Sequence, residues 1–413
     1  MSIILKNSQY NFKRKVYFLM KKIVDQRSKQ RELYENLLIA LFINVPAVNI
    51  VIASIIPSLS NGVMAILYLV LICLFFFDYF LHYIKRTHVE TIASVMVVFT
   101  IIIEYVLTWI KIGNQLSILY LVVYVLLPLL IISQMDINGE LVVKFCVLIP
   151  VIGVPFFQKV FQQTNKSISM GLSYAFLPAV IFAISYLLTC NRKNKLVTIA
   201  ALVDLIYFVL IFLYGSRGVV LSACIAVFMM WLIRKKINHK YDPYFGIKIG
   251  CISVVTIIIV IFRWQIVFFL SNFFNGKGIT VEFFDKIIRL QKLGGVDNGR
   301  SAINKVFLAE FVKKPLFGHG IKSFAYYTGI IYPHNFLYQM LFDIGIIGTL
   351  IIIVPIFTSA IKIFKRIGNY ENSTVLIALI CASVPGALFS GDLWLNPLLW
   401  LTFSLILRRE YRR

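Results

Sequence analysis

Apolar residues gather in long runs along this chain, separated by short polar or basic segments. A helix that crosses a bilayer needs about 20 mostly apolar residues, and lipid offers no hydrogen bonds to an open backbone. The pattern therefore predicts an all-α polytopic membrane protein with about 12 transmembrane helices. Their expected ranges are 37–57, 62–81, 90–110, 115–133, 141–160, 169–189, 196–214, 217–233, 247–269, 336–360, 374–390 and 393–407.

Three of these runs fit a full span less well than the others. The fifth, 141–160, is interrupted by Lys144, Pro150, Gly153 and Pro155. The eighth and the twelfth are short, which is compatible with half-spans or tilted helices.

The distribution of Lys and Arg predicts the orientation of the spans. With the N-terminus in the cytoplasm, the inside segments carry 25 Lys and Arg, while the short outside loops carry three. Positive residues favour the cytoplasmic side, so we expect an even number of spans with both termini inside. The predicted organisation is a basic amphipathic segment (1–36), spans one to nine (37–269), an extracytoplasmic loop (270–335), spans ten to twelve (336–407) and a basic cytoplasmic tail (408–413).

The long loop 270–335 carries its own helical signals. Thr280 is a candidate cap for a helix in which Val281, Phe284 and Ile288 share one face. Asp297 or Asn298 is a candidate cap for a second helix through Ser301–Lys314, with Ile303, Val306, Phe307 and Phe311 apolar; Pro315 ends it. We expect a small helical cap on the outer membrane face, since unstructured loops of this length are uncommon.

Composition excludes a soluble protein. Apolar residues make up 60% of the chain and charged residues 14%, against about 25% charged in soluble domains. The net charge of +23 is then explained by cytoplasmic loops and by anionic headgroups or substrates, and we expect no nucleic-acid partner. The six cysteines form no CxxC pair, so neither a disulfide framework nor a metal site is predicted.

Two arginines stand where a helix is expected to begin on the outer side. Arg217 lies in Gly215-Ser216-Arg217-Gly218, and Arg300 lies in Asn298-Gly299-Arg300. A guanidinium beside a helix N-terminus is suited to a phosphate or diphosphate. The alternatives are an Arg that extends to the membrane interface and a solvated loop Arg.

A third candidate stands where the loop re-enters the membrane. His334 in Tyr332-Pro333-His334-Asn335 lies near the water boundary and titrates near neutrality, so it is a candidate general base. Asn335 is a candidate sugar ligand, and Asp343 follows within the apolar run. The alternative is an interfacial His that only completes hydrogen bonds. Asp78, Glu104 and Asp204 are also intramembrane acids and carry the same default functional interpretation as Asp343.

The order of these sites resembles the superfamily of O-antigen ligases and O-antigen or capsular polysaccharide polymerases. The residues that carry the resemblance are Gly215-Ser216-Arg217-Gly218, Arg234-Lys235-Lys236, Asn298-Gly299-Arg300, Lys314-Pro315-Leu316-Phe317-Gly318-His319-Gly320, His334-Asn335 and Asp343-Ile344-Gly345-Ile346-Ile347-Gly348. They span about 200 to 350. Family members often have Glu where Asp343 stands.

The resemblance implies a GT-C-like glycosyltransferase that uses neither metal nor cofactor. Such enzymes move a glycan from an undecaprenyl-diphosphate carrier to a hydroxyl on the outer face of the cytoplasmic membrane. Arg217 and Arg300 would stabilise the diphosphate leaving group, and His334 would activate the acceptor. The resemblance also assigns substrate contacts to Asn335, Asp343, Lys322, Lys313 and Lys314. Lipid-linked oligosaccharides are the expected donor and acceptor, beside membrane lipids, a flippase and a chain-length regulator.

Four functions stay open at this point, one of them a non-catalytic sensor or assembly protein, which fits the long basic loop but does not explain the order Arg, Arg, His. A polymerase joins lipid-linked repeats, whereas a ligase moves a finished chain to another acceptor. Many Ile, Phe, Lys and Asn residues suggest an AT-rich genome, which favours a capsule polymerase if the cell has no lipid A. A lipid-linked oligosaccharide flippase or transporter would have about the same number of spans, but it predicts inverted repeats that the sequence does not show.

Overall fold

All secondary-structure elements in the described part of the computed structural model are helices, in agreement with the predicted all-α class. It describes residues 29–53, scattered positions from 55 to 77, 92–113, 116–135, 137–156, 168–190, 194–214, 217–237, 263–278, 282–292, 299–366, 373–389 and 391–407. Three of the described helices, Lys29–Ala53, Val95–Ile112 and Phe336–Phe364, are long and apolar enough to cross a membrane. Shorter apolar helices stand beside them, and the chain is an integral membrane protein.

Most of the described helices coincide with predicted spans. The regions expected to cross the membrane at 90–110, 169–189, 196–214 and 217–233 contain α3 (Ile92–Ile112), α8 (Ile168–Thr189), α9 (Lys195–Tyr214) and α10 (Arg217–Ile237). Near the C-terminus, α16 (Phe336–Arg366), α17 (Ser373–Phe389) and α18 (Pro397–Leu407) cover the last three predicted ranges. The fourth range contains α4 (Ile118–Tyr120), a π-helical stretch (Leu121–Leu126) and α5 (Leu127–Leu130).

The fifth predicted span is divided, as its interruptions suggested. α6 (Gly139–Leu148) ends before Pro150, and a 3-10 helix (Pro150–Phe156) follows. Because proline has no backbone N–H, Pro150 and Pro155 cannot continue the hydrogen-bond ladder of an α-helix. The Tyr207 hydroxyl donates to the carbonyl of Pro150 over 2.8 Å, so α9 supplies a partner at the break.

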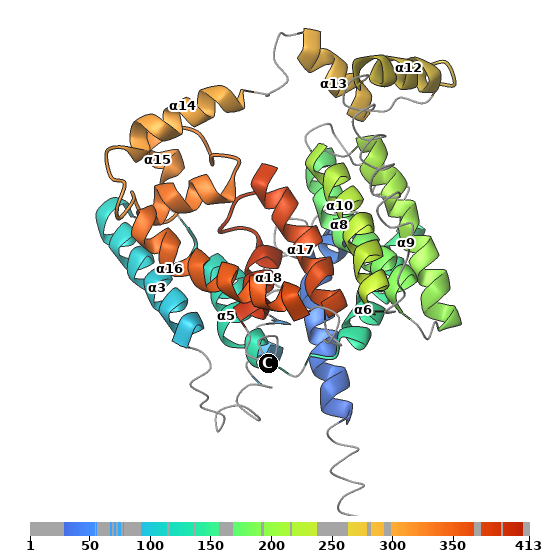
Figure 1. The fold of residues 1–413 in the computed structure, drawn as a ribbon, viewed down its shortest axis with the longest axis horizontal. Helices are drawn as coiled ribbons and strands as arrows, with labels where there is room; N and C mark the ends of the chain where they lie inside the picture. Colours follow the sequence, from blue (N-terminus) through green and yellow to red (C-terminus); the bar gives the residue numbers. More distant parts are fainter. Residues whose placement is uncertain are drawn as a thin grey trace, which may run out of the picture.

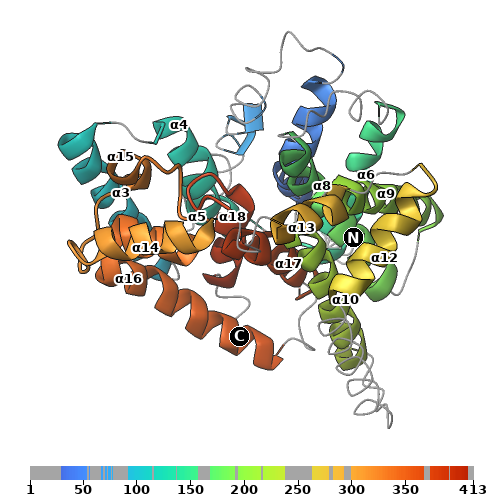
Figure 2. The same cartoon turned by 90° about the horizontal axis from the view of Figure 1, so that it is seen from above.

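The helices form two groups with α17 and α18 between them. In Figure 2, α3, α14 (Arg300–Phe311), α15 (Phe324–Thr328) and α16 lie on one side, and α8, α9 and α10 lie on the other. α17 packs against both α8 and α10, while α18 contacts α17, α16 and α5. One large cluster of buried apolar residues runs through these contacts.

The helices that lead into and form the long loop lie at one end of the molecule; the first, α12 (Arg263–Asn275), begins within the ninth predicted span, of which residues 247–262 lie outside the described residues. Figure 1 shows α12, α13 (Glu282–Lys292) and α14 at the end opposite to the start of helix Lys29–Ala53. The loop therefore contains helices at both predicted positions. α14 begins at Arg300 after Gly299, which is its N-cap; Asn298, Asp297 and Thr280 lie outside the described residues.

α14 and α15 are held to the start of α16 by aromatic packing. Phe307, Phe324 and Phe342 form a small buried core of their own, with Ile303 and Phe311 packed against it. The ring of Phe307 stacks on Tyr338 at 4.6 Å between centroids. Val306, which was expected on the same apolar face, is exposed.

α16 is broken at Gly345, where the backbone has φ 68° and ψ −174°. A break in an apolar helix leaves carbonyls and N–H groups without partners, which is costly in lipid. The segment 315–320 supplies those partners. The N–H groups of His319 and Gly320 donate to the carbonyls of Phe342 and Asp343, each over 2.8 Å. In return, Ile346 and Ile347 donate to the carbonyls of Pro315 and Leu316.

Two glycines permit this close contact. A Cβ atom at Gly318 would lie 2.6 Å from the carbonyl oxygen of Asp343, and one at Gly345 would collide with the carbonyl of Leu316. Both glycines also have positive φ, which side chains other than glycine rarely adopt. The glycines of these two motifs therefore serve to join the loop to the broken helix.

We predict that Gly345→Ala destabilises the protein by about 1–3 kcal/mol more than Gly329→Ala. Both positions have positive φ, but the Cβ of Gly345 meets backbone, whereas nothing lies within 4 Å of one at Gly329. Thermal unfolding of the two variants in detergent measures the difference. Equal losses of Tm would contradict the tight junction between the loop and α16.

Candidate functional site

His334 lies just before α16 in a left-handed backbone conformation, with φ 57°. Its ring is half-buried and contacts the ring of Tyr332 at 4.4 Å between centroids. Burial lowers the pKa of His334 below its usual 6.5, and the positive charge of Arg300 lowers this pKa further. The imidazole is therefore neutral at pH 7 and is able to accept a proton.

Arg300 is the first residue of α14, directly after Gly299, whose φ is 80°. The N–H groups of the first turn of a helix have no partner within the helix, and the helix dipole is positive at this end. The guanidinium thus adds its charge to an end that already attracts anions. The structure brings Arg300 close enough for its charge to act on His334, although 34 residues separate them in the sequence.

Arg217 is the first residue of α10. This agrees with the expected helix start. Its side chain is not among the described parts of the structure, nor are Gly215 and Ser216. Its distance to Arg300 and His334 therefore stays a prediction.

Asn335 caps α16. Its Oδ1 atom accepts hydrogen bonds from the backbone N–H groups of Leu337, over 2.9 Å, and Tyr338, over 3.3 Å. A side-chain acceptor at this position satisfies N–H groups that the helix leaves free. Asn335 thus sets where α16 begins and holds the preceding His334 at the helix entrance.

Asp343 is fully buried on α16, two residues before the break. Its Oδ2 atom accepts hydrogen bonds from the indole N–H of Trp394, over 2.6 Å, and from the backbone N–H of Lys322, over 3.0 Å. Its Oδ1 atom has no hydrogen-bond partner in the described structure. Asp343 therefore joins the long loop, α16 and the α17–α18 connection at one point.

Lys322 extends this junction. Its backbone is left-handed, with φ 60°, and its ammonium group forms an ion pair with Asp392. The side chains of Lys322 and Asp392 are 14% and 8% exposed, so water screens the pair poorly. Burial lowers the pKa of Lys322, while the Asp343 carboxylate acts in the opposite direction.

Asp392 is the residue that the sequence analysis missed. Its Oδ1 atom accepts from the side-chain amide of Gln339 and from the backbone N–H of Trp394, each over 3.0 Å. Gln339 in turn accepts from the N–H of Leu393 over 2.8 Å. Asp392 is the only acid between residues 372 and 409, and it stands in the short break between two apolar runs. This isolated position could have marked Asp392 as a candidate from the sequence alone.

The remaining basic candidates differ in their surroundings. Lys313 forms an ion pair with Glu310 over 2.6 Å and is 62% exposed. Lys314 is exposed, and its contact with Lys111 lowers its pKa, followed by smaller effects of burial and of the Lys111 charge. Lys111 and Lys314 together form a concentration of positive charge where the end of α3 meets the segment that follows α14.

His319 has a structural role. It is 3% exposed, its ring stacks on Phe342 at 4.4 Å, and its Nε2 lies 3.0 Å from the carbonyl oxygen of Glu310. Its pKa is lowered, first by burial. His319 is therefore packed between the loop and α16, whereas His334 lies just before the start of α16.

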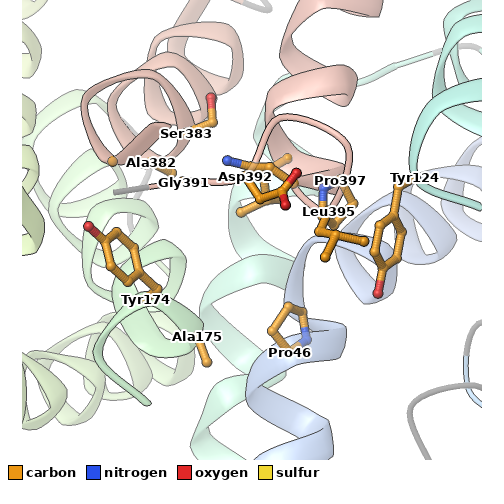
Figure 3. A pocket seen from close by; sticks show the side chains of 13 residues that line it. Pro46, Tyr124, Tyr174, Ala175, Ala382, Ser383, Gly391, Asp392, Leu395 and Pro397 are labelled. Atoms are coloured by element: carbon orange, nitrogen blue, oxygen red, sulfur yellow. The ribbon is translucent and has the colours of Figure 1, made fainter. Parts of the chain in front are cut away.

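A cavity of about 270 Å³ opens beside Asp392. Its walls come from helix Lys29–Ala53, the π-helical stretch, α8, α17 and α18. Figure 3 shows Asp392 between the rings of Tyr124 and Tyr174. Within the described residues, no group of three or more His, Cys, Asp and Glu side chains gathers as metal ligands would.

The described residues thus form a helical integral membrane protein with a cationic, histidine-containing candidate site at the start of a broken helix. Residues 202–353 match the family model described as O-antigen ligase. The resemblance to the O-antigen ligase and polymerase superfamily is thereby confirmed, and members of this family are glycosyltransferase-like enzymes. The matched region contains Arg217, Arg300, His334 and Asp343 but ends before Asp392. No curated protein matches the chain in sequence.

The Lys322–Asp392 pair is predicted to contribute far more to stability than Lys313–Glu310. Removing one partner of a buried pair leaves an uncompensated charge, so Lys322→Met should cost about 3 kcal/mol. The exposed pair is the control, and Lys313→Met should cost about 0–1 kcal/mol.

A double-mutant cycle with Asp392→Asn isolates the interaction. We expect the double variant to be less destabilised than the sum of the single variants by more than about 1 kcal/mol. Additive losses would show that Lys322 and Asp392 do not interact in the membrane-embedded protein.

Proposed function

We propose that this protein is a polysaccharide polymerase. It transfers a glycan from an undecaprenyl-diphosphate carrier to a hydroxyl of a lipid-linked repeat on the outer face of the cytoplasmic membrane. The observation that carries the proposal is the family match over residues 202–353, which contains both Arg300, at the start of α14, and His334, just before α16. Both termini are then cytoplasmic, and a flippase and a chain-length regulator are the expected partner proteins.

Arg300 stabilises the leaving group in this reaction. As the bond between the anomeric carbon and the diphosphate breaks, both electrons go to the diphosphate oxygen. The guanidinium and the positive end of the α14 helix dipole meet this developing charge in a fixed position. Arg217, at the start of α10, supplies a second cation of the same kind.

His334 acts on the acceptor. A neutral imidazole nitrogen takes the proton from the acceptor hydroxyl. The oxygen of this hydroxyl forms the new glycosidic bond to the anomeric carbon at the same time. The lowered pKa of His334 supports this role, because it keeps the ring unprotonated at neutral pH. Arg300 thus serves twice, since its charge both attracts the diphosphate and helps to keep His334 neutral.

The other predicted site residues divide into two groups. Lys313 and Lys314 are exposed and attract the anionic carrier to the site. Lys322, Asn335 and Asp343 are engaged by other parts of the protein, so we assign them to positioning of the loop and of α16. This revises their expected role as direct substrate contacts.

Arg300→Ala and His334→Ala should each abolish long polymer in cells that lack the wild-type gene, while the amount of membrane protein stays normal. Loss of one preorganised contact to the developing charge costs about 10²–10³-fold in rate. Lys305→Ala is the control, because it removes one exposed positive charge from the same helix. Size separation of surface and lipid-linked glycans measures the outcome.

The glycans that accumulate separate the candidate functions. Single repeats on the carrier indicate a polymerase. Long chains stranded on the carrier indicate a ligase that serves another acceptor. Repeats trapped on the cytoplasmic face indicate a transporter, and normal polymer in both variants refutes the assignment of the site.

The transfer rate should fall on the acid side of its pH profile with a midpoint below pH 6.5. A base with a lowered pKa stays unprotonated down to that pKa, so activity falls only as the pH drops through the value of His334. The rate of the purified enzyme as a function of pH measures this midpoint. His319→Gln is the control, since the pKa of His319 is also lowered, and its removal should leave the midpoint unchanged. A midpoint above pH 6.5 would contradict a general base at His334.

A further inference from the structure

The cavity beside Asp392 is not explained by the chemistry at Arg300 and His334. It lies between transmembrane helices, yet its wall contains the Asp392 carboxylate and two tyrosines (Figure 3). We propose that it binds one uncharged sugar ring of the lipid-linked glycan and so fixes the chain next to the reacting group. This inference rests on the proposed function.

The wall has the chemistry of a sugar site. Asp392 receives hydrogen bonds from Lys322, Gln339 and the N–H of Trp394. A carboxylate has about four acceptor positions, so one remains for a donor such as a sugar hydroxyl. Tyr124 and Tyr174 stand on opposite sides of Asp392 in the view of Figure 3, and tyrosine combines an apolar ring face with a polar tip.

The charge of the wall favours a neutral ring. The Asp392 carboxylate is compensated by Lys322, and no Lys, Arg or His is among the described residues that line the cavity. An acidic sugar would therefore bring an anion to a carboxylate without a cation to receive it, which is costly away from water. A neutral pyranose brings hydroxyl donors and carries no charge.

The size of the cavity also fits a single ring. Pockets for drug-sized ligands measure about 300–1,000 Å³, and this cavity of about 270 Å³ lies just below that range. Gly386 keeps it open, because a Cβ at this position would lie 2.9 Å from the Cε1 atom of Tyr174. A larger residue would push the tyrosine ring toward the cavity.

The cavity is connected to the reacting groups by α16. Gln339, which holds Asp392, lies one turn of helix after Asn335, and one turn is about 5.4 Å. Lys322 holds Asp392 from the other side and belongs to the loop that carries Arg300. A ring beside Asp392 is thus within a short stretch of glycan from His334.

The test compares binding of two probes to the full-length protein in nanodiscs. One probe is bare undecaprenyl diphosphate, and the other is the undecaprenyl-diphosphate-linked oligosaccharide extracted from cells that lack the gene. The wild type should bind the glycosylated carrier at least about tenfold more tightly than the bare carrier. Ala382→Leu, which adds bulk to the cavity wall, should bring this ratio close to one without changing affinity for the bare carrier.

A second pair of variants covers the case in which Ala382→Leu does not fold. Tyr124 and Tyr120 stack at 5.2 Å, but only Tyr124 lines the cavity. Tyr124→Leu and Tyr120→Leu both lose the stacking, so only Tyr124→Leu should reduce the preference for the glycosylated carrier, by about three- to tenfold.

The outcomes separate this inference from the proposed function. Arg300→Ala should weaken binding of both probes; if it changes neither, the proposed function fails. If the cavity variants leave the preference for the glycosylated carrier intact, the sugar site is wrong and the proposed function stands. Weaker binding of the bare carrier to the cavity variants would mean that the cavity holds the lipid tail, which also overturns the inference.

Discussion

The hydrogen bonds across the break in α16 are the constraint on which the site depends. A helix that stops at Gly345 inside an apolar environment must find other partners for its carbonyls and N–H groups. The segment 315–320 provides them in both directions, at distances of 2.8–3.1 Å. This exchange ties the loop to the membrane helix, and it does so only because Gly318 and Gly345 leave room for two backbones to meet.

The attachment of the loop to α16 also fixes the positions of the polar groups around it. His319 and the aromatic rings of α14 and α15 pack on the first half of α16, so Arg300 lies close to the entrance where His334 stands. On the inner side, Asp343, Lys322 and Asp392 connect the same half-helix to the α17–α18 connection. A buried network of this kind defines one arrangement, because each unpaired member would be costly in a low dielectric.

The proximity of Arg300 to His334 couples binding and proton transfer. A cation that attracts a diphosphate also disfavours protonation of a neighbouring imidazole. In the proposed reaction, the same charge therefore contributes to leaving-group stabilisation and to the availability of the base. The cavity at Asp392 is lined by residues outside the region that matches the O-antigen ligase family, and in our proposal it adds a place for the glycan itself.

The sequence by itself determined the helical class, most helix positions and the two loop helices, because lipid requires long apolar runs and because proline and glycine mark helix ends. It also singled out Arg300 and His334 as candidates, because Arg300 stands at a predicted helix start and His334 where the loop re-enters the membrane. Only the tertiary structure revealed that Asp343 is buried against Trp394 and that Asp392 faces a cavity. The reason is that these roles depend on partners up to 70 residues apart, and local pattern carries no information about which distant backbones meet.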